Sequence, residues 1–80
     1  MKILSSALAH EGLGIVQEEA DKYGLSVHVI MSPSRSHDAV MARARIVDRL
    51  IKRGWTYTDA GLLMGRVHST AIRLQRMVMT

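Results

Sequence analysis

The sequence contains no cysteine and no phenylalanine, and it has a single proline among its 80 residues. Without cysteine, a disulfide framework, thiol catalysis and zinc sites built on cysteine are all excluded. No apolar run approaches the roughly 20 residues that a membrane-spanning helix needs. The apolar stretch near Met1 is too short for a secretory signal, which also needs a cleavage site. We therefore expect a cytoplasmic protein with no membrane partner.

Sequence patterns that support catalysis are also missing. There is no glycine-rich phosphate loop ending in Lys-Ser or Lys-Thr, so no nucleotide cofactor is expected. The histidines do not have the spacing of metal ligands, and no nucleophile lies in a recognisable arrangement with a base. A chain of this length forms one small domain, with little room for both a core and a catalytic cleft. We expect neither an enzyme nor a metal site.

The charges of the chain are unevenly distributed. Residues 1–34 hold two basic and four acidic residues, whereas residues 35–80 hold nine basic and three acidic residues. A basic half predicts an anionic partner, although a solvated basic surface gives the same pattern. Eight of the eleven basic residues are arginine, which suits bidentate contacts to phosphate and guanine.

The first part of the chain has one clear helical pattern. Apolar residues recur at helical intervals over 13–23, and Gly24 is a natural stop. Residues 1–12 form either an arm or a short helix. The β-branched residues of 25–31 favour a strand, but no second strand pattern exists to pair with it. We therefore predict a helical turn there, capped by Ser26.

A loop over 32–37 is followed by a longer helix. Asp38 is the expected N-cap, and Gly54 ends the helix. An apolar stripe would face the core, and the basic residues would lie largely outside it; they are Arg43, Arg45, Arg49, Lys52 and Arg53. The 48% apolar content suffices for one small core.

Two shorter helices are expected to follow. Thr56 begins a pattern with capping-box spacing, and Gly65 breaks the helix that Thr56 opens. A further amphipathic helix is predicted from about Val67 to Met79. The fold class is therefore all-α, a compact bundle of about five helices that contains a helix-turn-helix.

In a helix-turn-helix, the second helix lies in the major groove with its N-terminal residues facing base edges. Short polar side chains that donate and accept hydrogen bonds are suited to that position. His68, Ser69 and Thr70 meet this requirement. The N–H groups at the start of a helix also attract phosphate.

The same residues resemble a known family. Met64-Gly-Arg-Val-His-Ser-Thr-Ala71 is similar to the Gly-Arg-Asp-His-Ser/Thr-Thr-Val signature of the C-terminal DNA-binding domain of the bacterial replication initiator DnaA. That domain belongs to the Trp-repressor-like helix-turn-helix group. The resemblance extends over about residues 15–79. It implies a DNA-binding domain at 13–80, preceded by the arm or short helix at 1–12.

The resemblance implies a role for individual residues. His68, Ser69 and Thr70 would face bases in the major groove, and Arg35 would enter the adjacent minor groove. Phosphates would be held by Arg45, Lys52 and Arg66. Thr56 would cap the first helix of the motif near the DNA backbone, and Arg73 completes the expected DNA-binding set.

Two departures from the family bear on function. Val67 stands where the family has Asp, which can accept from a cytosine amino group and can cap the recognition helix. The reading of the family's usual DNA box is therefore expected to change at one position or more. The missing phosphate loop removes the ATPase activity with which the initiator melts an origin.

The sequence thus predicts a non-enzymatic, sequence-specific binder of double-stranded DNA that acts in transcriptional regulation or in the control of replication initiation. An alternative is a small interaction module that modulates a replication or transcription protein. In that case the acidic first helix, with Glu18 and Glu19, would be the contact.

Overall fold

The computed structural model describes residues 4–78, and these form five α-helices without a strand. The prediction of an all-α bundle of about five helices is confirmed. The helices are α1 (Ser6–Lys22), α2 (Val27–Met31), α3 (His37–Lys52), α4 (Tyr57–Leu63) and α5 (His68–Arg76). Among the described residues, no helix is both long and apolar enough to cross a membrane.

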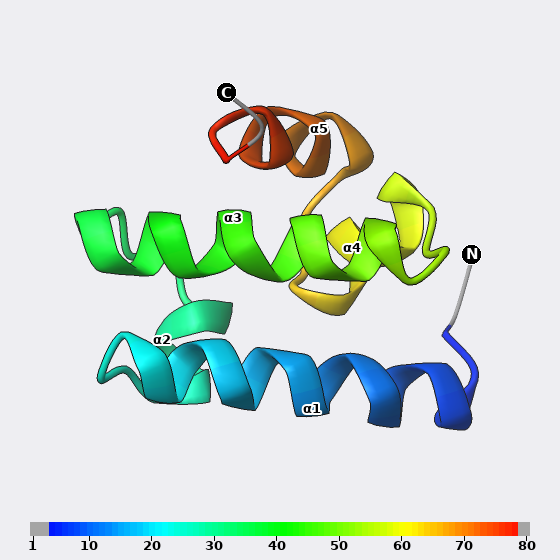
Figure 1. The fold of residues 1–80 in the computed structure, drawn as a ribbon, viewed down its shortest axis with the longest axis horizontal. Coiled ribbons are helices and arrows are strands. Elements are labelled where there is room, and N and C mark those ends of the chain that lie inside the picture. The colour runs from blue at the N-terminus through cyan, green and yellow to red at the C-terminus, as the bar shows by residue number, and fades with distance from the viewer. Residues whose placement is uncertain (1–3, 79–80) are drawn as a thin grey trace.

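Helix α3 lies at the centre of the bundle (Figure 1). Helix α1 runs antiparallel along one side of it, and α5 packs on the opposite side. Helix α4 contacts α1, α3 and α5, while the short α2 packs against α1 and α3. The largest fully buried side chains come from α1, α2, α3 and the turn after α4; they are Val16, Ile30, Ile46, Val47, Leu50 and Met64.

Helix α1 begins earlier than the sequence pattern predicts. Residues 6–12 are its first turns, so neither a separate arm nor a separate short helix exists among the described residues of 1–12. The Oγ of Ser5 caps the helix by accepting from the N–H of Leu8 at 3.2 Å. Gly12 weakens the local helical signal, but it is buried against the ring of Trp55. Packing against Trp55 therefore offsets the low helix propensity of Gly12 itself. Residues 1–3 lie outside the described part.

Substituting alanine for the two glycines of α1 is expected to change the stability of the protein in opposite directions. A Cβ at Gly14 meets nothing within 4 Å, so Gly14→Ala should raise the free energy of unfolding by up to about 1 kcal/mol. A Cβ at Gly12 would lie 2.7 Å from both Leu63 Cδ2 and Trp55 Cη2. Overpacking of this kind costs about 1–3 kcal/mol, so Gly12→Ala should destabilise the protein. Urea denaturation followed by circular dichroism measures both, and equal stabilisation by the two variants would contradict the packing.

The caps of α2 and α3 partly match the prediction. Ser26 caps α2 by accepting from the N–H of Val29 at 3.2 Å, so the predicted helical turn is confirmed. The prediction of Asp38 as the N-cap of α3 is wrong. Ser36 is the cap, with its Oγ accepting from the N–H of Ala39 at 3.3 Å. Asp38 lies in the first turn instead, where a carboxylate interacts favourably with the helix dipole.

The boundaries of the last two helices follow the predicted signals closely. Thr56 caps α4, since its Oγ1 accepts from the N–H of Asp59 at 3.1 Å. Gly65 has a φ of 70°, in the left-handed region that glycine adopts without steric cost, and it ends α4 as expected. Helix α5 has Val67 as its N-cap and ends at Arg76. The predicted end near Met79 lies outside the described residues.

Candidate nucleic-acid interface

The turn between α4 and α5 is unusually close to the helix that precedes it. The N–H of Arg66 donates to the carbonyl of Gly61 at 2.7 Å. A Cβ on Gly61 would lie 2.7 Å from the backbone oxygen of Arg66 and 3.0 Å from that of Val67. Only a residue without a side chain permits this approach. Gly61 therefore sets where α5 begins relative to α4.

A polar contact further along fixes the same pair of helices. The hydroxyl of Tyr57 donates to the side-chain carbonyl of Gln75, which is buried. Ala71 and Leu74 of α5 also lie in the core. The inner face of α5 is thus anchored at both its start and its end, so its outer face has a defined orientation.

The first residues of α5 are presented to solvent. His68 and Ser69 are exposed, and Val67 is 64% exposed. The valine side chain offers no acceptor, so the N-cap makes no side-chain hydrogen bond to the first turn. Thr70 is half-buried and faces a groove beside the helix. The three polar residues predicted to face bases are consecutive at one helix start, and two of them are freely accessible.

The groove has a volume of about 550 Å³ and is bordered by α5, by the N-terminal part of α3 and by the loop of residues 32–36. We refer to it as the arginine groove, since four arginines line it: Arg35, Arg43, Arg66 and Arg73. None of the described residues that line it is acidic. Its remaining walls come from Pro33, Val40, Leu74 and Met77, among others. Such a groove suits an anionic ligand with apolar edges.

The burial of Arg43 is the largest difference from the predicted positions of the basic residues. It was expected outside the apolar stripe of α3, but it is only 4% exposed. Its guanidinium donates to four backbone carbonyls, namely those of Val29, Ile30, Ser32 and Ser34, at 2.7–3.2 Å. The sequence did contain a signal, because position 43 is four residues from both Ala39 and Val47, which are buried.

Arg66 lies beside Arg43. Its Nη2 donates to the carbonyl of Ser32 at 2.8 Å, and its Nη1 donates to that of Met64 at 2.7 Å. Burial lowers the pKa of both guanidinium groups, and the charge of Arg66 lowers the pKa of Arg43 further. Both groups remain protonated, because arginine keeps its proton in proteins. The floor of the groove therefore holds two adjacent positive charges that an anion would neutralise.

Three residues of the predicted set lie away from the groove. Arg45 is exposed on α3 and borders a smaller hollow with Glu19 and Asp48. The Nζ of Lys52 forms an ion pair with Asp48 at 2.8 Å. Thr56 is exposed and serves as the cap of α4. The structure thus gathers Arg35, Arg66, Thr70 and Arg73 around one groove, with His68 and Ser69 next to it along the chain.

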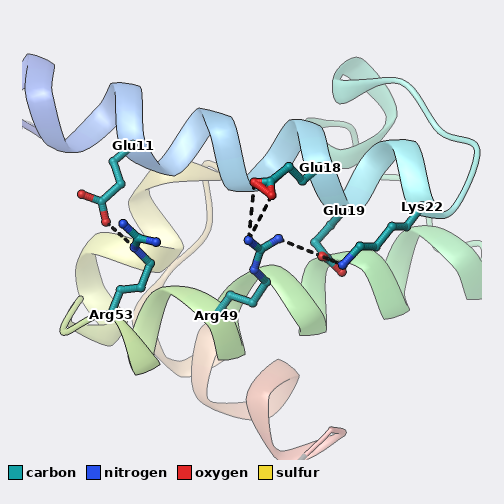
Figure 2. A network of polar contacts seen from close by, with 6 residues as sticks. All are labelled: Glu11, Glu18, Glu19, Lys22, Arg49 and Arg53. Atoms are coloured by element: carbon teal, nitrogen blue, oxygen red, sulfur yellow. Dashed lines mark hydrogen bonds and ion pairs between the residues drawn. The ribbon is translucent and has the colours of Figure 1, made fainter.

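Three of the acidic residues of α1, Glu11, Glu18 and Glu19, pair with arginines of α3 and of the turn that follows it (Figure 2). Arg49 donates to Glu19 at 2.9 Å and to Glu18 at 3.2 Å, while Arg53 donates to Glu11 at 2.9 Å. Glu19 is buried and also pairs with Lys22. These carboxylates join two helices of the same chain. Glu19 is therefore engaged within the molecule, whereas the side chain of Glu18 is 59% exposed beside Arg49.

Glu11 gives this network a pH-dependent signal. Hydrogen bonds from Arg53 and then from Trp55 hold the pKa of Glu11 below its usual value of 4.5. The ion pair therefore contributes stability above pH 4.5, and the contribution is lost as the pH falls through the lower pKa of the folded state.

The indole of Trp55 donates to Glu11 at 3.3 Å, and Trp55 is the only tryptophan. Tryptophan fluorescence should titrate below pH 4.5 in the wild type and lose this step in Glu11→Gln. An identical titration in the variant would contradict the contact.

Comparison with known proteins finds no matching family model, no matching curated protein and no matching solved structure. The resemblance to the initiator domain rests on the motif residues of this chain.

Proposed function

We propose that this chain is a non-enzymatic, sequence-specific binder of double-stranded DNA of the helix-turn-helix type. In this proposal α4 and α5 form the motif, and α5 lies in the major groove. The observation that carries it is the arginine groove along α5, next to the exposed start of that helix. Phosphate contacts position such a protein on DNA, while base contacts give it sequence preference.

The residues divide between these two roles. His68 and Ser69 are exposed at the start of α5 and supply hydrogen-bonding groups for base edges. The exposed Val67 supplies an apolar surface for a thymine methyl group. Arg73 is exposed and borders the groove, where it would hold a phosphate. Arg35, on the opposite side, would reach into the minor groove.

Such a domain would act in transcriptional regulation or in the control of replication initiation, by occupying sites on DNA. The interaction-module alternative gains no support from α1. Its Glu18 and Glu19 both bind Arg49 of α3, and Glu19 is almost inaccessible.

Fluorescence anisotropy of labelled duplexes at several salt concentrations tests the proposal. The duplexes would carry the initiator box, a scrambled sequence and a sequence selected from a random pool. We expect strong salt dependence and one preferred sequence, with that preference reduced about tenfold in His68→Ala. Ser6→Ala, at the first position of α1, is the control for an exposed residue outside the interface. No binding at low salt would refute the proposal, and equal binding to all duplexes would reduce it to a nonspecific basic domain.

A further inference from the structure

We propose that Arg43 and Arg66 form a carbonyl clamp that fixes the loop of residues 32–36 before any ligand binds. The loop carries Arg35, which is exposed at the edge of the arginine groove. Both arginines then act as positioning residues for Arg35, and Arg66 keeps further donors for a phosphate. This inference rests on the proposed DNA-binding function.

Arg43 provides most of the clamp. Four of its five N–H donors are spent on backbone carbonyls between residues 29 and 34. These carbonyls lie in the last turn of α2 and in the loop that follows it, where a helix leaves carbonyls without helical partners. The carbonyl of Val29 also accepts from the N–H and the hydroxyl of Ser32. The contacts reach from α3 to a segment 9–14 residues earlier in the chain. An arginine used in this way has little capacity left for phosphate, so its contribution to binding is indirect.

Arg66 joins the same loop to the start of α5. Its Nη2 and the Nη2 of Arg43 both donate to the carbonyl of Ser32, at 2.8 Å each. The contact from Arg66 spans 34 residues of sequence. Arg66 also donates to Met64, in the turn between α4 and α5. One carbonyl therefore connects both sides of the groove, and the position of the loop is coupled to that of α5.

Serine side chains order the loop locally. The N–H of Ser34 donates to Ser32 Oγ at 3.2 Å, and the N–H of Ser36 donates to Ser34 Oγ at 3.4 Å. Ser36 then caps α3. Arg35 lies between two residues whose backbones are held in this way. Ordering the loop in the free protein removes an entropic cost that would otherwise reduce affinity.

The test exploits the difference between arginine and lysine. Lysine keeps the positive charge, but its compact ammonium group cannot donate to four separate carbonyls as the planar guanidinium group of arginine does. We expect Arg43→Lys to weaken duplex binding about tenfold, and less than about twofold in the Arg35→Ala background. Arg76→Lys, an exposed position of α5 outside the groove, is the matched control and should bind as the wild type does. Equal losses in both backgrounds would overturn the clamp, because a general structural defect does not depend on Arg35.

Amide hydrogen exchange on the full, unliganded chain supplies a second measurement. The N–H of Ser34 should be protected in the wild type and exchange at least about tenfold faster in Arg43→Lys, while amides in the centre of α1 stay unchanged. A fully unprotected Ser34 in the wild type would overturn the clamp without any variant. If the wild type binds no duplex but Ser34 is protected as expected, the clamp stands and the DNA-binding proposal fails.

Discussion

Gly61→Ala is expected to lower the free energy of unfolding by about 3 kcal/mol. In an ordinary helix position, alanine would stabilise by up to about 1 kcal/mol, so the expected sign is reversed. The cause is the 2.7 Å approach between a new Cβ and the backbone oxygen of Arg66. A backbone atom cannot move aside as the end of a flexible side chain can. Relief requires α5 to shift away from α4.

Urea denaturation monitored by circular dichroism measures this loss. Gly14→Ala is the matched control, because it adds the same methyl group in a helix where nothing lies within 4 Å. Under the proposed function, the shift of α5 should also weaken duplex binding at temperatures where Gly61→Ala is still folded. A Gly61→Ala variant as stable as the wild type would show that the turn is looser than described.

Under the proposed function, replacing both Arg35 and Arg73 by alanine is expected to weaken duplex binding roughly 100-fold at low salt, about tenfold for each charged hydrogen-bonding group. Both side chains are exposed at the arginine groove. Each lost contact also means that fewer counterions leave the DNA when the protein binds. The slope of log affinity against log salt should therefore decrease in magnitude by about 0.9 per residue.

Anisotropy titrations between low and moderate salt give both quantities. Arg76→Ala removes one charge from the same helix without altering the groove, and it should change the slope much less. If Arg76→Ala and the groove variants reduced the slope equally per charge, binding would depend on net charge alone. The groove would then have no special part in it.

Local signals predicted the helix boundaries in the C-terminal half well. Thr56 caps α4 and Gly65 ends it. Both signals are local, because a helix start needs a nearby side-chain acceptor and a helix end needs a residue that adopts a left-handed φ. Ser26 was predicted for the same reason and is confirmed. Asp38 and Ser36 are both good caps, and the choice between them depends on how the preceding loop is held.

Long-range contacts account for what the sequence did not reveal. The early start of α1 depends on Gly12 fitting under Trp55, which lies 43 residues further along the chain. The helical spacing places Arg43 on the buried face of α3, but its burial also depends on loop carbonyls that the sequence does not reveal, so this charged side chain was expected outside. Of the predicted site, Arg35, Arg66, Thr70 and Arg73 meet at one groove. Lys52 was also predicted, but its nearest charge is Asp48 of its own helix.

The central position of α3 has a consequence for long-range electrostatics. Between the described residues, α1 and α5 make no contact, since α3 separates them (Figure 1). Glu11, Glu18 and Glu19 belong to the α1 side, and the arginine groove belongs to the α5 side. Because these carboxylates are paired with Arg49, Arg53 and Lys22, the unpaired positive charge is concentrated on the α5 side, and this asymmetry gives a dipole along the α1–α3–α5 stack although the net charge is only +4. In the field of a polyanion this dipole would turn the α5 side forward during diffusion, so that productive encounters form faster than random collision allows.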